Sequence, residues 1–179
     1  MSKLTRTLAV LAASLVFTPA VLAQTPPPPP QPGPEHAKLK EMEGAWDCVM
    51  KMGDMESKAT AIYKSDLGGF WITSEFQGDF GGMKFTGRGL DGYDPMKKKY
   101  VGVWVDSMSP GAMVSEGTYD AAGKVLTMTG EGAGQDGKPA KYKMTTEHKD
   151  KDHFVFSMYM IGPDGKEVPA FTIDYRRRK

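Results

Sequence analysis

The chain has 179 residues, of which 40% are hydrophobic and 25% are charged, a composition typical of a globular protein. Its 23 Lys and Arg side chains nearly balance 22 Asp and Glu side chains, and both signs are interspersed along the sequence. This balance excludes the strongly basic surface that nucleic acids attract, so we predict no nucleic-acid partner.

Residues 1–23 carry the pattern of a secretory signal peptide. Lys3 and Arg6 precede an apolar run over residues 8–17, and Val21-Leu22-Ala23 supplies the residues before a cleavage site. The apolar run is too short to span a bilayer comfortably and no second run follows it, so we predict no membrane insertion. We expect cleavage after Ala23 and a mature chain in the periplasm or outside the cell.

Residues 24–34 are rich in proline, which favours an extended and disordered segment. A ligand for an aromatic groove is the alternative for this segment. The remaining residues, 35–179, have the size of one domain. Cys48 is the only cysteine, so this domain forms no internal disulfide. Its alternation with Trp46 and Met50 favours a buried, unreactive thiol.

The domain is predicted to begin with one short helix. The stretch from Glu35 places Leu39 and Met42 at helical spacing, and we expect Gly44 to cap its C-terminus. From residue 45 onward the apolar residues alternate with a period of two, which predicts strands and no further helix. The ten predicted strands cover residues 45–52, 55–65, 70–78, 83–93, 100–106, 112–119, 125–132, 140–148, 154–161 and 167–176.

The segments between these strands are short turns, such as DAAGK after Tyr119 and PDGK after Gly162. Connections of this length join antiparallel strands and cannot form parallel crossovers. We therefore predict an all-β fold, a closed up-and-down antiparallel barrel of about ten strands, with a two-sheet sandwich as the alternative. Glycines within strands, such as Gly87 and Gly117, favour bends of a coiled sheet. A phosphate-binding loop is disfavoured because no helix follows these glycines.

Several long segments carry a family resemblance. They are GAW at Gly44, MESKATA at Met55, LGGFW at Leu67, GDFGGMKFTGRGLDGYD at Gly78, KKYVGVWVDSMS at Lys98, SEGTYD at Ser115 and FSMYMIGPDGKE at Phe156. Together these segments resemble the bacterial family called domain of unknown function 1579. That family is similar to the calycin group of lipocalin-like barrels, so the resemblance implies a closed barrel with an N-terminal helix near one opening. It implies no activity and no catalytic residue.

The sequence contains none of the common hydrolase, phosphotransferase or zinc-site motifs. Carboxylates at strand positions leave an enzyme of unfamiliar type as one hypothesis, because two of them converging inside a barrel could act as an acid and a base. Outward-facing polar residues are the favoured interpretation of these carboxylates. They are Glu75, Asp106, Glu116 and Glu131.

Histidine gives no sign of a cofactor. His148 and His153 flank a charged DKD turn, which favours a solvated loop tip for both. The predicted closing strand, EVPAFTIDYRR, contains no histidine, so an axial haem ligand is not expected there. We predict no cofactor.

Two M-x-M pairs, Met50 with Met52 and Met158 with Met160, place their thioethers on one face of a strand. Soft thioethers suit Cu(I), so a periplasmic copper-handling protein is a further hypothesis. Packing or an apolar pocket lining is favoured, because Phe154 and Phe156 continue the face of the second pair.

The leading hypothesis is a binding module, in which the barrel interior accepts one small apolar or amphipathic ligand. Trp104 and Asp106 alternate with Val103 and Val105, and we expect the large indole ring to face inward because its burial gains more than that of valine. The candidate ligand-binding residues are Trp71, Glu75, Arg88, Trp104, Asp106, Glu116 and Tyr159.

Overall fold

A computed structural model of the chain describes residues 28–134 and 137–179. Residues 31–179 form one compact unit, which is described here by itself. The predicted signal peptide lies outside the described residues. Residues 28–33 form neither helix nor strand. In the part of the chain that the structure describes, no helix is both long enough and apolar enough to cross a membrane.

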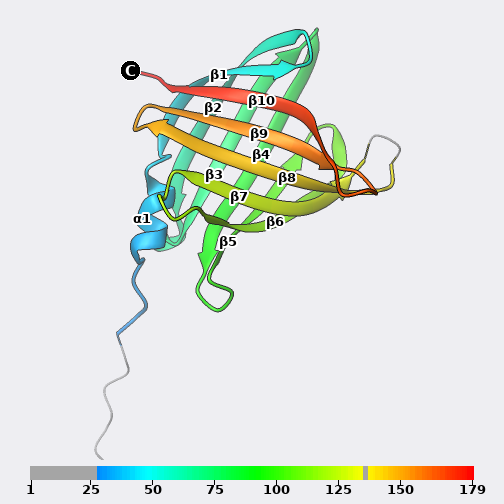
Figure 1. Cartoon of the computed structure of the whole chain (residues 1–179). Coiled ribbons are helices and arrows are strands. Elements are labelled where there is room, and N and C mark those ends of the chain that lie inside the picture. The colour runs from blue at the N-terminus through cyan, green and yellow to red at the C-terminus, as the bar shows by residue number, and fades with distance from the viewer. Residues whose placement is uncertain (1–27, 135–136) are drawn as a thin grey trace, which may run out of the picture. The chain divides into compact units, whose positions relative to one another are not determined.

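Ten antiparallel strands form one closed barrel, which confirms the predicted fold class (Figure 1). Each strand pairs with its neighbours in sequence, and β1 pairs with β10 to close the ring. The strands are β1 (Gly44–Met52), β2 (Met55–Asp66), β3 (Trp71–Phe80), β4 (Met83–Asp94), β5 (Lys99–Asp106), β6 (Ser109–Tyr119), β7 (Val125–Ala133), β8 (Pro139–Asp150), β9 (His153–Ile161) and β10 (Glu167–Arg177).

The single α-helix, α1 (Pro34–Lys40), lies against one end of the barrel (Figure 1). Proline stands at its start, where a missing backbone N–H costs nothing. Leu39 is buried and packs against Ile72, Tyr100 and Leu126, which come from β3, β5 and β7. These strands belong to one half of the ring, from β3 to β7, so the helix covers that half of this barrel end.

The predicted helix end at Gly44 is wrong. The helix ends at Lys40 with Glu41 as its cap, and Gly44 is already the first residue of β1. Gly44 has a φ of +133° for a different reason: a Cβ there would lie 2.6 Å from Nη1 of Arg177. Glycine is needed to admit the arginine, rather than to end a helix.

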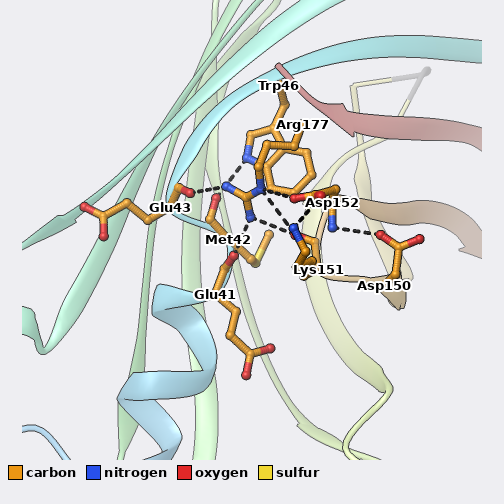
Figure 2. A network of polar contacts seen from close by, with 8 residues as sticks. All are labelled: Glu41, Met42, Glu43, Trp46, Asp150, Lys151, Asp152 and Arg177. Carbon is orange, nitrogen blue, oxygen red and sulfur yellow. Dashed lines mark hydrogen bonds and ion pairs between the residues drawn. The ribbon is translucent and has the colours of Figure 1, made fainter. Parts of the chain in front are cut away.

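Arg177, at the end of β10, joins the helix end to the barrel (Figure 2). Its guanidinium group lies 4.2 Å from the centre of the Trp46 ring and donates to the backbone oxygens of Glu41 and Glu43. It also donates to Asp152 and to the carbonyl of Lys151, in the turn between β8 and β9. Trp46 Nε1 donates to the Met42 carbonyl at 2.9 Å. The Arg177 side chain thus joins the segment after α1, the end of β10 and the turn between β8 and β9.

The two ends of the barrel interior differ in packing. Near α1, Trp46, Ile72 and Phe154 are 1%, 1% and 2% exposed, and they lie beside the partly buried Tyr63, Tyr93, Tyr119 and His148. At the opposite end Tyr142 is buried, but five inward apolar side chains are only partly buried and pack against the core clusters. We call these residues the open mouth: Phe80, Phe85, Met113, Met160 and Phe171.

Candidate functional site

Five of the seven predicted ligand-binding residues lie on the outer wall of the barrel: Trp71, Glu75, Arg88, Glu116 and Tyr159. Glu75 and Arg88 are cross-strand partners there, and Glu116 forms ion pairs with Lys97 and Lys99. These five side chains do not line the interior. The period of two separates two faces of a strand but does not say which face is inside.

Trp71 and Tyr159 have structural partners on the same outer wall. The Trp71 ring covers Gly92, where a Cβ would lie 2.5 Å from the indole. Lys143 Nζ lies 5.8 Å from the centre of the Tyr159 ring. Both rings therefore cover the outside of the sheet, as large amphipathic side chains do.

Trp104 and Asp106 lie on the inner face of β5, toward the open mouth. Trp104 packs against the main core cluster, and its Nε1 donates to Asp106 Oδ2 at 3.0 Å. The other carboxylate oxygen, Oδ1, accepts hydrogen bonds from the backbone N–H groups of Met108 and Ser109. Asp106 therefore holds the tight turn into β6 and fixes the orientation of the indole.

The four carboxylates considered for acid–base catalysis do not form one cluster. Glu131 lies on the outer wall with its Oε1 3.8 Å from Lys141 Nζ, and Glu75 and Glu116 lie on the same wall with partners of their own. The Asp106 carboxylate accepts a hydrogen bond from the turn that follows it. Among the residues that the structure describes, no group of three or more His, Cys, Asp or Glu side chains could hold a metal ion. Of the four, Glu75 and Asp106 border one hollow of about 300 Å³, but the Asp106 carboxylate there is already held by Trp104 and by the turn into β6.

The methionine pairs serve packing. Met50 and Met158 are each 9% exposed and belong to two separate core clusters. Met160 lies at the open mouth, and Met52 is exposed at the turn between β1 and β2. The thioethers of each pair are thus divided between the core and the barrel end.

A continuous series of aromatic rings lines the interior just above α1. Successive ring centres lie 4.3–6.4 Å apart, mostly in edge-to-face or tilted arrangements. We call this series the aromatic belt: Tyr63, Tyr93, Tyr100, Tyr119, His148, Phe154 and Tyr175. Burial raises the pKa of Tyr100 to about 12, and it raises the pKa of Tyr63 and Tyr119 further. These phenols stay neutral, and the belt forms the floor of the interior.

The expectation that His148 lies in a solvated loop tip is wrong. β8 continues to Asp150, so His148 lies within the strand, and its Nε2 is 2.9 Å from the Tyr119 hydroxyl. Burial lowers the pKa of His148, and the charge of Lys38 on α1 lowers it further. The imidazole is therefore neutral at physiological pH. His153, by contrast, lies on the outer side of β9 with its Nε2 2.8 Å from Asp174.

Asp91 is the interior residue that the sequence did not reveal. It lies on the inner face of β4, one inward position further from α1 than Tyr93. No described residue gives its carboxylate a hydrogen bond or an ion pair. Its two carboxylate oxygens are not fully buried, so a water molecule can reach them. Burial raises the pKa of Asp91 to about 7. A signal was present, because Gly87, Gly89, Asp91 and Tyr93 alternate on one face.

Two hollows also open between strands on the outer wall. One, of about 650 Å³, lies over β1 to β4 and is bordered by charged side chains that include Asp47, Lys58 and Lys84. The other, of about 300 Å³, lies over β3 to β5 and is bordered by three of the predicted ligand-binding residues, Glu75, Arg88 and Asp106. Both are wide open, so neither has the enclosed character of a small-ligand pocket.

Comparison with known proteins is informative about ancestry and fold. A family model described as "Protein of unknown function (DUF1579)" matches residues 31–177. The chain belongs to this family. Membership in DUF1579 confirms the resemblance seen in the sequence, and the match extends over the helix and all ten strands. A search of curated proteins found no match.

A solved structure supports the barrel fold of this DUF1579 member. The chain is similar to Rv2717c from M. tuberculosis, with a TM-score of 0.59 and 14% identity over 82% of this chain and 99% of that chain. It also matches a de novo designed fluorescence-activating β-barrel, with a TM-score of 0.44 and 17% identity over 78% of this chain and 96% of that chain. At these identities the likeness to Rv2717c shows the fold alone.

Proposed function

We propose that this DUF1579 protein is exported and binds one small apolar or amphipathic ligand inside its barrel. The observation that carries the proposal is the difference between the two barrel ends. Helix α1 and the aromatic belt seal one end, whereas the open mouth presents partly exposed Phe and Met side chains. A barrel that only stabilised itself would bury both ends alike, because exposed apolar area forgoes about 25 cal/mol per Å².

The chemistry of the interior suits such a ligand. Small-molecule sites are mostly apolar, with a few polar groups that fix orientation. Here the mouth is apolar apart from Asp106, which Trp104 and its own turn already hold, and the other polar groups lie deeper, at Asp91 and the hydroxyls of the aromatic belt. Methionine at the entrance suits ligands of varied shape, because its unbranched side chain adapts to its neighbours.

Export is the second part of the proposal. It is supported by the charged, apolar and cleavage regions of residues 1–23. The absence of any possible internal disulfide is no obstacle, since the barrel has an extensive core of its own. Mass spectrometry of the protein from a periplasmic fraction should give the mass of a chain that begins at Gln24. An uncleaved chain retained in the cytoplasm would contradict export.

Binding is best tested with an uncharged fluorophore, N-phenyl-1-naphthylamine, whose emission rises in apolar surroundings. We expect saturable binding to the protein at one site. Met113→Trp should block the open mouth and weaken binding at least tenfold, because Met113 faces inward against Gly132. Val114→Trp is the matched control. Val114 is the next residue in β6, and its side chain points outward and is 61% exposed, so this substitution should not change binding.

Three results would count against interior binding. They are absence of saturable fluorescence, equal affinity in both tryptophan variants, and a weaker effect of Met113→Trp than of Val114→Trp. Native mass spectrometry of protein purified from its own host adds an independent measurement. A retained mass that disappears in Met113→Trp would support the proposal and would identify the ligand by its mass.

A further inference from the structure

The unpaired carboxylate of Asp91 lies between the aromatic belt and the open mouth. Two glycines make the room for it. A Cβ on Gly102 would lie 2.4 Å from Asp91 Oδ1 and 3.3 Å from Ser115 Oγ. A Cβ on Gly89 would lie 2.4 Å from Ser74 Oγ and 3.5 Å from Asp91 Oδ2. Serine hydroxyls thus lie on two sides of the carboxylate, and the backbone of the two glycines lies beneath it.

The charge of this interior is one-sided. On the inward faces of the described strands, Arg177 is the only Lys or Arg, and it is held by backbone carbonyls and Asp152 at the sealed end. His148 is neutral, since burial lowers its pKa. Lys38 of α1 lies over the belt, with its Nζ 5.7 Å from the centre of the Tyr119 ring, but it pairs with Glu41 and does not shift the pKa of Asp91, so no described cation balances this carboxylate. An ionised carboxylate without a partner in such surroundings is costly, and a cation beside it would remove that cost.

The aromatic belt adds a second attraction for a cation. The charge of Asp91 reaches Tyr63, Tyr119 and Tyr175, because it contributes to the raised pKa of each. Tyrosine rings attract ammonium groups through their negative faces, and the attraction grows when both partners leave water. A carboxylate above a floor of tyrosines combines the two elements that recognise an alkylammonium group.

Building on the proposed ligand site, on which this inference rests, we propose that the ligand carries a protonated amine that pairs with Asp91 while its apolar part extends to the open mouth. The chemical class is an amphiphilic or aromatic primary amine. The two serine hydroxyls beside Asp91 would accept the remaining N–H groups, which a carboxylate alone cannot satisfy. An anionic amphiphile of the same length would meet the Asp91 charge and bind less well.

The test compares three twelve-carbon probes that differ only in their head group: dodecylamine, dodecanol and dodecanoate. Each probe is added at pH 8 to protein that holds N-phenyl-1-naphthylamine, at concentrations below the critical micelle concentration of the probe. The fall in fluorescence gives the affinity of the probe. We expect dodecylamine to bind about tenfold more tightly than dodecanol, and dodecanoate more weakly than both. Equal affinities for the amine and the alcohol, or a preference for the acid, would overturn the proposal without any variant being made.

Asp91→Asn then assigns the preference to a residue. It should abolish the advantage of dodecylamine over dodecanol, and a circular dichroism spectrum that matches the unaltered protein shows that the variant is folded. Asp79→Asn is the charge-matched control, because Asp79 lies on the outer wall in an ion pair with Lys84. A preference that survives in Asp91→Asn, or that falls equally in Asp79→Asn, contradicts the role of Asp91. Loss of fluorophore binding by the unaltered protein refutes the ligand site itself, so the two failures are distinguishable.

Discussion

The indole ring of Trp104 occupies the space directly over Gly87, where a Cβ would lie 2.1 Å from Cζ2. Gly87→Ala must therefore displace a large ring that is also anchored by Asp106. We expect a loss of about 1–3 kcal/mol in the free energy of unfolding, measured by urea denaturation. Gly111→Ala is the control, because a Cβ there meets nothing within 4 Å. An equal effect of the two substitutions would show that loss of backbone freedom, rather than displacement of the ring, matters.

Arg177 should be irreplaceable by lysine. Its guanidinium group donates to carbonyls of Glu41, Glu43 and Lys151 at once, which a single ammonium group cannot reach. We expect Arg177→Lys to lower the free energy of unfolding by about 2 kcal/mol. Arg176→Lys, next to it but 62% exposed in its side chain, should change stability little. Stability that is unchanged in Arg177→Lys would mean that the network in Figure 2 contributes no net energy.

Stability should fall as pH rises through the range in which Asp91 titrates. Burial raises the pKa of Asp91 from 3.8 to about 7, so the unfolded chain loses this proton first. Between about pH 4 and pH 7 the folded state binds more protons, and the free energy of unfolding decreases; above pH 7 the contribution is constant. The full difference is about 4 kcal/mol.

Asp91→Asn should remove this slope and raise stability at pH 8, as measured by urea denaturation at pH 5 and pH 8. Asp79→Asn should behave in the opposite way, because a hydrogen bond from Lys84 lowers the pKa of Asp79. Its small contribution is present above pH 4 and is lost in acid. A pH slope that persists in Asp91→Asn would assign the effect to another group.

The thiol of Cys48 should be unreactive in the folded protein. It is 2% exposed, and burial raises its pKa to about 12, so almost no thiolate exists at pH 8. We expect negligible modification by a disulfide reagent in buffer and complete modification in urea. Rapid reaction in buffer would show that the wall at β1 opens frequently. Cys48→Ser should also destabilise the barrel, because it places a hydroxyl among apolar neighbours.

The strand pattern was predictable because each short turn left only one way to connect neighbouring strands. All ten predicted strands exist, and their ends coincide with the prediction or differ by at most three residues. The end of the helix was not predictable in the same way. Gly44 has the sequence character of a cap, but its conformation serves the approach of Arg177, a residue from the other end of the chain. The residues next to Gly44 in the sequence do not reveal a conformation that depends on the closing of the barrel.

The interior site was largely hidden for a related reason. Alternation places Asp91 with Gly89 and Tyr93, yet the same alternation applies to Arg88 and Leu90 on the opposite face. Only the closed ring decides which set is enclosed. Trp104 could be assigned by size, since a buried indole outweighs a valine, whereas a charged residue such as Asp91 would by itself be expected outside. A charge placed inside against that expectation is one of the observations on which the ligand proposal rests.

The seam between β1 and β10 also determines the order in which the protein can fold. Trp46 pairs with Arg177 across this seam, so the first and last strands must meet before the ring exists. The aromatic belt is likewise incomplete until β9 and β10 supply Phe154 and Tyr175. An unfinished chain is therefore an open sheet with two free edges and an uncovered apolar face. We therefore expect the barrel to form only after the last strand is available, and a chain without β10 should not fold into a stable partial barrel.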